Sequence, residues 1–161
     1  MRLTASSMFV LLAMVPLTAL AASKQDKLCA PLRSFAMSVP NGQTKSVEFH
    51  TSWLSPFKDM DQATIGAFKR CDAHGSAAGK ALCAYLMGAQ NAAVEFAGNN
   101  VKRALLCLSP GTRFGPHYLL LESAEFHLSY GTSHRGSNVT LTFGTDTKIG
   151  GAIFVITAQG Y

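Results

Sequence analysis

The chain has 161 residues but only one tryptophan, four cysteines and nine acidic residues, and it lacks most of the short motifs that mark a reaction centre. It has no Cys-x-x-Cys, which excludes a thioredoxin-like redox pair and a zinc knuckle. It has no His-Glu-x-x-His, and no two of its five histidines have the i, i+2 or i, i+4 spacing of a local metal site. The sequence therefore predicts no metal site and no cofactor.

The motifs of nucleotide and nucleic-acid binding are missing as well. The chain contains no P-loop, no dinucleotide glycine pattern and no aromatic–basic RNA signature. We therefore expect no nucleic acid among its partners.

The usual hydrolase signatures are also absent. Residues 131–136 (GTSHRG) contain one residue too many for the Gly-x-Ser-x-Gly elbow. Glu122 and Glu125 are close in the chain, but they face opposite sides on a strand and share a face only on a helix. We interpret them as solvated side chains. These absences favour a non-enzyme over an enzyme; the alternative is an envelope hydrolase with a dispersed site of Glu125, His127 and His134.

Residues 1–21 have the pattern of a signal peptide. Arg2 provides a positive start, residues 8–20 are nearly all apolar, and Ala19-Leu20-Ala21 is the small-x-small pattern that signal peptidase reads. The apolar run is too short to span a bilayer comfortably. We therefore expect a periplasmic or secreted bacterial protein that is not an integral membrane protein after signal removal, with a single domain over residues 22–161.

An even number of cysteines in an exported chain predicts two disulfides, with four buried free thiols as the alternative. Four cysteines allow three pairings. We favour Cys71–Cys83 and Cys29–Cys107, which close one short loop and one long loop.

Three helical segments follow from the apolar spacing. The first covers residues 28–39, where Leu28, Leu32 and Phe35 share one face. A second is predicted from Asp59 or Asp61 through Cys71, and a third begins at a Ser76 cap and runs to residue 89. The short connection between the second and third predicts an antiparallel helical hairpin.

Alternation of apolar and polar residues predicts the strands. Residues 44–53 read as a half-buried strand that ends at Trp53. We expect Trp53 to be a core anchor, with a ligand-stacking residue as the alternative. Residues 94–96 and 101–108 read as a β-hairpin; the competing interpretation continues the preceding helix through Phe96. Further strands are expected within residues 118–130, 138–143 and 152–158, the last of them buried on both faces. The predicted fold class is α+β: an antiparallel sheet with a helical hairpin packed on one face, stapled by disulfides.

Lysine and arginine exceed aspartate and glutamate by five, and the surplus is scattered along the chain. Two glycine-flanked loops, residues 109–117 and 131–138, are candidates for binding. The first presents Arg113 and Phe114, and the second presents His134 and Arg135. Arginine forks suit carboxylate or phosphate, so an anionic component of the cell envelope is one candidate ligand. Ordinary exposed turns are the competing interpretation.

One part of the chain resembles a known family. Residues 83–88 (CAYLMG), Ala92 and residues 107–112 (CLSPGT) are similar to the Cys-x-x-Tyr-x-x-Gly … Cys-x-Pro-x-Gly-x-Thr pattern of the Rap/Tai proteins. These are exported periplasmic proteins that neutralise amidase effectors of type VI secretion. The resemblance implies a small, disulfide-stapled inhibitor that plugs the active site of an enzyme. That family is mainly helical, whereas residues 131–161 of this chain predict β-structure.

The sequence therefore predicts an exported, non-catalytic binding protein whose partner is another protein. The resemblance implies the narrower role of an inhibitor or immunity partner of an effector enzyme.

Overall fold

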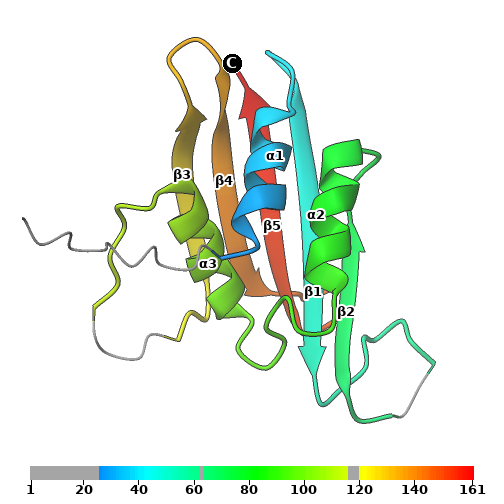
Figure 1. The fold of residues 1–161 in the computed structure, drawn as a ribbon. Coiled ribbons are helices and arrows are strands. Elements are labelled where there is room, and N and C mark those ends of the chain that lie inside the picture. The colour runs from blue at the N-terminus through cyan, green and yellow to red at the C-terminus, as the bar shows by residue number, and fades with distance from the viewer. Residues whose placement is uncertain (1–25, 62–63, 116–119) are drawn as a thin grey trace, which may run out of the picture.

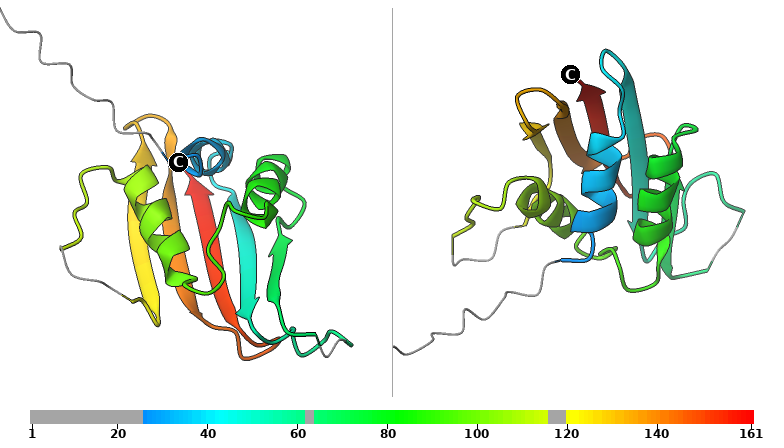
Figure 2. Two further views of the ribbon diagram at one scale, coloured as in Figure 1. Left: turned by 60° about the horizontal axis from the view of Figure 1, so that its bottom comes forward. Right: turned by 45° about the horizontal axis from the view of Figure 1, so that its top comes forward.

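The computed structural model describes residues 26–61, 64–115 and 120–161. It shows a two-layer α+β fold in which one five-stranded antiparallel sheet is covered on one face by three helices (Figures 1 and 2). The strands are β1 (Thr44–Trp53), β2 (Ala67–Asp72), β3 (Ala124–Gly131), β4 (Gly136–Thr145) and β5 (Ala152–Gly160). The helices are α1 (Cys29–Met37), α2 (Ala77–Met87) and α3 (Gly98–Leu108). The predicted α+β class, an antiparallel sheet with helices packed on one face, is confirmed.

The sheet is made of two units joined at its centre. The β1–β2 hairpin and the β3–β4–β5 meander meet where β5 pairs with β1, which gives the strand order β2-β1-β5-β4-β3. Phe49 of β1 lies opposite Phe154 of β5, and Phe154 in turn lies opposite Phe143 of β4. The last strand of the chain thus occupies the middle of the sheet.

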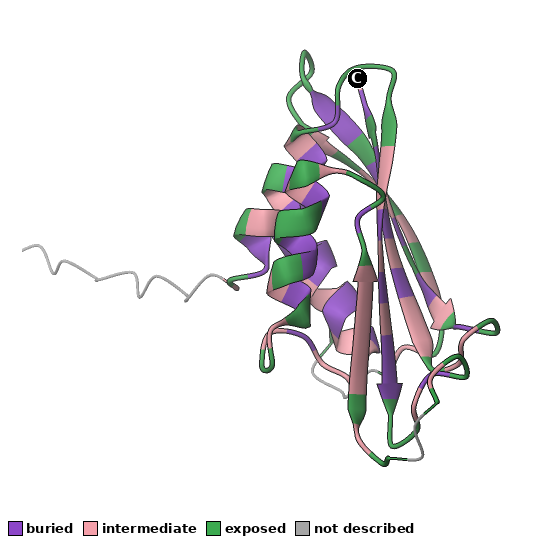
Figure 3. Cartoon of the chain, turned by 90° about the vertical axis from the view of Figure 1, so that its right-hand side faces the viewer, coloured by how far each residue is buried: buried purple, intermediate pink, exposed green. Residues whose placement is uncertain are grey.

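The hydrophobic core lies between the sheet and the helices. Leu28, Leu32 and Phe35 are fully buried at helical spacing, as the sequence predicted for the first helix. The alternating residues of β1, β4 and β5 complete the core from the sheet side: Val47, Phe49, Val139, Leu141, Phe154 and Ile156. The opposite face of the sheet carries no helix, and its residues are half-buried or exposed for most of its length (Figure 3).

The two predicted disulfides are confirmed. Cys29 of α1 is bonded to Cys107 of α3, and Cys71 of β2 is bonded to Cys83 of α2. The first bond joins two neighbouring helices, and the second fixes α2 to the edge strand beneath it. No helix among the described residues is long and apolar enough to cross a membrane.

The helix predicted from Asp59 or Asp61 through Cys71 is wrong. Residues 67–72 form strand β2, whose six residues pair with β1 from Glu48 to Trp53. Ile65, which began the predicted apolar stripe, is 76% exposed in the preceding loop. Three apolar residues at helical spacing cover only two turns, so the local preference for a helix is weak. Pairing of these residues with strand β1 outweighs that preference. The predicted hairpin of two consecutive helices is therefore absent, because strand β2 precedes α2. Helices α1 and α3 complete the helical layer.

The β-hairpin predicted over residues 94–96 and 101–108 is also wrong, as is the alternative that extended the preceding helix through Phe96. Helix α2 ends at Met87 and residues 98–108 form helix α3. Val101, Ala104, Leu105 and Leu108 are buried at i, i+3, i+4 and i+7, which is the helical period. In the sequence, the turn-forming residues Gly98-Asn99-Asn100 favoured a hairpin over that helical period.

Most of the remaining element predictions agree with the structure to within a few residues. The strand expected within residues 118–130 begins only at Ala124, and residues 118 and 119 lie outside the described residues. The Ser76 cap is confirmed, because its Oγ accepts a hydrogen bond from the N–H of Gly79 at 3.1 Å. Strand β5 is central but not fully buried on both faces: Phe154, Ile156 and Ala158 are buried towards the helices, while the residues between them are half-buried or exposed. The predicted signal peptide (residues 1–21) lies outside the described residues.

Candidate functional site

Two adjoining hollows lie at the lower end of the molecule in Figure 1, where β1 ends and β5 begins. One hollow of about 260 Å³ is walled by the ends of these strands, by the loop between α2 and α3, and by the segment before β3. A second hollow of about 500 Å³ adjoins it on the side of β2. Both are lined by Trp53, Val94 and Glu95. We refer to the two hollows together as the Trp53 groove.

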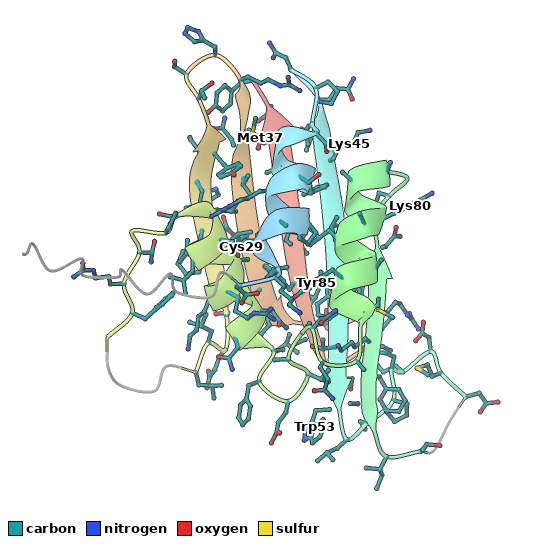
Figure 4. All side chains as sticks on the ribbon, in the orientation of Figure 1. Cys29, Met37, Lys45, Trp53, Lys80 and Tyr85 are labelled. Carbon is teal, nitrogen blue, oxygen red and sulfur yellow. A yellow bond between two sulfur atoms is a disulfide. The ribbon has the colours of Figure 1, made fainter. Side chains whose placement is uncertain are left out.

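Trp53 is not the core anchor that the sequence predicted. It lies on the helix-facing side of β1, in line with Val47, Phe49 and Thr51, which are all buried. Trp53 itself is 46% exposed, at the lower end of β1 (Figure 4). Helix α2 ends at Met87 and α3 begins at Gly98, so only the loop between them reaches this end of the strand. Trp53 therefore points to the helix-covered side of the sheet, but it lies beyond the ends of the helices that cover the rest of that side.

Other large apolar side chains are exposed around the same groove. Phe96 of the α2–α3 loop is 43% exposed and Leu120 is 54% exposed, and both line the smaller hollow with Trp53. These three residues come from three separate segments, so only the folded chain brings them together. A concave apolar surface of this kind is characteristic of interaction sites in soluble proteins.

The loop that forms one wall of the groove is fixed by two polar residues of α3. The side chain of buried Asn100 accepts from the N–H of Ala93 at 2.9 Å and donates to its carbonyl at 2.8 Å. Arg103 donates to the carbonyl of Asn91 and, through two further bonds of 2.6 and 2.7 Å, to the carboxylate of Asp26. The Arg103 guanidinium thereby lowers the pKa of Asp26. The groove wall is therefore held in place by a hydrogen-bonded network.

A second concentration of polar groups lies on the face of the sheet that carries no helix. His50 of β1 contacts Asp146 through Nδ1 at 2.7 Å, and its Nε2 lies 3.7 Å from Glu48. The other oxygen of Glu48 lies 3.1 Å from Nε2 of His74. Burial alone would raise the pKa of Asp146, but hydrogen bonds from the N–H groups of Ile149 and Lys148 and from His50 outweigh it, so the pKa is lowered.

Two loops cover the lower end of this face. In the loop between β1 and β2, Phe57 is buried against Phe68, and Arg70 lies over the Phe57 ring at 5.0 Å. The N–H of Lys58 in that loop donates to the carbonyl of Ile149 in the loop between β4 and β5. The Asp146–His50 pair therefore belongs to a second, smaller packed region, and we interpret it as a structural contact. The described residues contain no group of three or more His, Cys, Asp or Glu that could hold a metal ion.

The two loops singled out from the sequence lie in different parts of the fold, and none of their described residues lines the groove. Residues 116 and 117 of the first loop lie outside the described residues. Arg113 is exposed in the segment after α3, whereas Phe114 is half-buried with the Lys102 ammonium 5.8 Å from its ring. His134 and Arg135 are exposed in the turn between β3 and β4, at the upper end of the molecule in Figure 1. The structure does not combine these four residues into one site.

The dispersed hydrolase site is not assembled either. Glu125 and His127 form a pair at 2.8 Å, but their side chains are 58% and 70% exposed on the surface of edge strand β3. His134 follows the other end of that strand, in the β3–β4 turn. These three residues do not converge in a cleft among the described residues.

The sequence analysis missed the Trp53 groove and the His50–Asp146 contact. His50 and Asp146 are 96 residues apart, and no local spacing connects them. For the groove, the one available signal was the clustering of Trp53-Leu54 and of Val94 and Phe96 near loop residues.

Comparison with known proteins adds no assignment, since no family model, curated protein or solved structure matches this chain.

Proposed function

We propose that this chain is an exported binding protein that recognises another protein through the Trp53 groove. One observation carries the proposal: the single tryptophan is half exposed and lines two adjoining hollows that the fold builds from separate segments, with Phe96 and Leu120 exposed beside it. Tryptophan is the residue type most enriched among the side chains that dominate binding energy at protein interfaces. Its exposure on a rigid strand makes it an anchor that is already in position before the partner arrives.

The fold itself gives no reason for this exposed apolar surface. The main core is complete without Trp53, Phe96 and Leu120, since the helix-facing residues of the sheet are buried up to Thr51. Leaving several large apolar side chains in water at one place carries a free-energy cost that the burial of that surface against a partner recovers. A protein partner fits better than a small ligand because the two hollows adjoin each other, are open to solvent and have large apolar side chains exposed around them.

Export is part of the proposal. It is supported by the signal-peptide pattern of residues 1–21 and by the two disulfides, which form and persist in oxidising compartments. A periplasmic or secreted location would place the groove where it meets envelope or extracellular proteins.

The resemblance to the Rap/Tai proteins suggests a more specific form of this role, in which the partner is an effector enzyme and the chain inhibits it. The residues that carry the resemblance fall at the C-terminal half of α2 and at the end of α3. Ala92, which belongs to the same pattern, lines the larger hollow. An inhibitor needs a rigid surface, and the network of Asn100 and Arg103 provides one at this wall.

The test begins with the oxidised protein lacking residues 1–21, used to capture partners from the envelope and the secretome. A partner retained in stoichiometric amount is then purified and titrated against the wild type, Trp53→Ala and Leu106→Ala by calorimetry. Leu106 is a matched control because it is 39% exposed on α3 and does not line either hollow.

We expect Trp53→Ala to lose at least about 30-fold in affinity, as for an interface anchor worth about 2 kcal/mol or more. Leu106→Ala should bind within about twofold of the wild type. Equal loss in both variants, or no loss in Trp53→Ala while its melting curve matches the wild type, contradicts the proposal.

A further inference from the structure

Two glutamates line the smaller hollow of the Trp53 groove together with its aromatic residues. Glu95 comes from the α2–α3 loop and Glu122 from the segment before β3. Both residues are exposed, and we refer to them as the rim of the hollow; Trp53, Phe96 and Leu120 line the same hollow. The hollow therefore combines apolar side chains with two acidic residues.

These two carboxylates differ from six of the other seven acidic residues of the chain, the exception being Asp61. All nine acidic residues lie in the described part, and six of them contact a basic side chain: Asp26, Glu48, Asp59, Asp72, Glu125 and Asp146. Neither Glu95 nor Glu122 has a cationic group of the described residues within 4.0 Å. In a chain with more basic than acidic residues, two uncompensated carboxylates at one hollow make a local negative site on a positive protein.

We propose that the smaller hollow binds an arginine side chain of the partner protein. Arginine carries an apolar stem and a planar cation, so its stem can pack against Leu120 and its guanidinium can stack on Trp53. The guanidinium then reaches the rim, where it donates hydrogen bonds to Glu95 and Glu122. This inference rests on the proposed function and specifies which residue of the partner the groove selects.

The alternatives fit this hollow less well. A purely apolar anchor would bury the walls but leave two carboxylates partly desolvated without a partner, which opposes binding. An acidic anchor would be repelled by both glutamates. Among cations, arginine suits the site better than lysine because its planar group matches both an indole face and carboxylates.

The first test uses N-acetyl-argininamide as the probe and the full oxidised protein lacking residues 1–21. Binding is followed by the fluorescence of Trp53 and by the NMR signal of its indole N–H. N-acetyl-citrullinamide is the matched control, because it has nearly the same shape and no charge. We expect the arginine probe to shift both signals and citrulline to leave them unchanged.

The second test removes the charges of the two rim glutamates and keeps the shape of their side chains. The variant Glu95→Gln/Glu122→Gln should raise the dissociation constant of the arginine probe at least about tenfold, as expected for the loss of charge-assisted hydrogen bonds. Glu125→Gln, on the far face of the sheet, is the control and should bind like the wild type. Equal binding of citrulline and arginine, no shift with arginine, or unchanged binding in the double variant overturns the inference.

Binding of the captured partner to these variants distinguishes a failure of this inference from a failure of the proposed function. If Trp53→Ala weakens partner binding and Glu95→Gln/Glu122→Gln does not, the groove is the interface but an arginine anchor is wrong. If both weaken it, and replacement of one partner arginine by glutamine removes the effect of the double variant, both proposals hold. If neither weakens it, both fail.

Discussion

Nδ1 of His50 lies 2.7 Å from Oδ2 of Asp146 and joins the middle of β1 to the loop between β4 and β5, 96 residues later in the chain. The two side chains are only 12% and 6% exposed. Asp146 also accepts hydrogen bonds from the N–H groups of Lys148 and Ile149, so its carboxylate organises its own loop as well. A buried carboxylate with three donors stabilises a fold more than a surface ion pair does.

Asp146→Asn should therefore destabilise the protein. The amide keeps the shape of the side chain but removes its charge and replaces one acceptor oxygen with a donor, so the charge-assisted hydrogen bonds of the carboxylate are lost. We expect the free energy of unfolding at pH 7, measured with urea, to fall by about 1 to 3 kcal/mol. Glu125→Gln removes the charge of the exposed Glu125–His127 pair and should change it by less than about 1 kcal/mol. Similar values for both variants would show that burial of the His50 contact has no energetic effect.

The stability difference between the wild type and Asp146→Asn should also depend on pH. The pKa of Asp146 is lower in the folded chain than its usual value of 3.8, so folding favours the ionised form. This contribution is fully present above the unfolded pKa and is lost as the pH falls through the folded pKa. Urea unfolding at a series of pH values below 4 should show the difference shrinking. A difference that stays constant or grows in this range contradicts the assignment.

The two disulfides should contribute unequally to stability. Cys29–Cys107 spans 78 residues and Cys71–Cys83 spans 12, so the first restricts the unfolded chain more. We expect Cys29→Ala/Cys107→Ala to lower the free energy of unfolding by about 4 to 5 kcal/mol and Cys71→Ala/Cys83→Ala by about 3 kcal/mol. Guanidinium unfolding of both variants under the same conditions gives the comparison. The reverse order would contradict loop closure as the source of the stability.

Gly151 should tolerate alanine poorly. Its φ is +78°, and a Cβ there would overlap the backbone carbonyl of Thr51 beside the groove. We expect Gly151→Ala to lower the free energy of unfolding by about 1 to 3 kcal/mol through backbone strain alone. Gly144, at the other side of the same loop, has open space around its Cβ position, and Gly144→Ala should stay within about 0.5 kcal/mol of the wild type. Thermal and urea unfolding of the pair tests this, and equal stabilities would refute the geometry at Gly151.

The exposure of Trp53 can be measured directly, because it is the single tryptophan in the sequence. Acrylamide, a neutral quencher, should reduce its fluorescence in the folded protein to an extent between that of a buried indole and that of the guanidinium-unfolded chain. Addition of a purified partner should protect it. Fluorescence that acrylamide does not quench in the free protein would show that Trp53 is buried and that the groove does not exist in solution.

The part of the fold that the sequence predicted depends on local patterns with one clear period. Val47, Phe49 and Thr51 alternate in β1, as do Val139, Leu141 and Phe143 in β4, and all of them are buried. Two segments were assigned wrongly because their patterns were short or mixed. In β2, pairing with β1 and the bond from Cys71 to Cys83 determine the structure; in α3, a glycine–asparagine turn signal coincides with the helix start.

The candidate site was less predictable than the fold. Whether Trp53 is buried or exposed depends on where α2 ends and where α3 begins. The sequence around residue 53 contains no information on these two helix boundaries, which lie at Met87 and Gly98. Glu95 and Glu122 share a hollow only because their two segments converge below α3. Local sequence reports which face of a strand a residue occupies, but it does not report how far the opposite layer extends.

The central position of β5 has a consequence for how the chain must be made. The β1–β2 hairpin and the β3–β4 hairpin each need β5 to complete their pairing, and β5 follows both hairpins in the chain, so it is synthesised after them. Until it arrives, β1 and β4 both present unpaired strand edges, which are prone to pair with other chains. The sheet therefore closes only after synthesis of the strand is finished, and an unfinished or truncated chain is a candidate for aggregation or proteolysis.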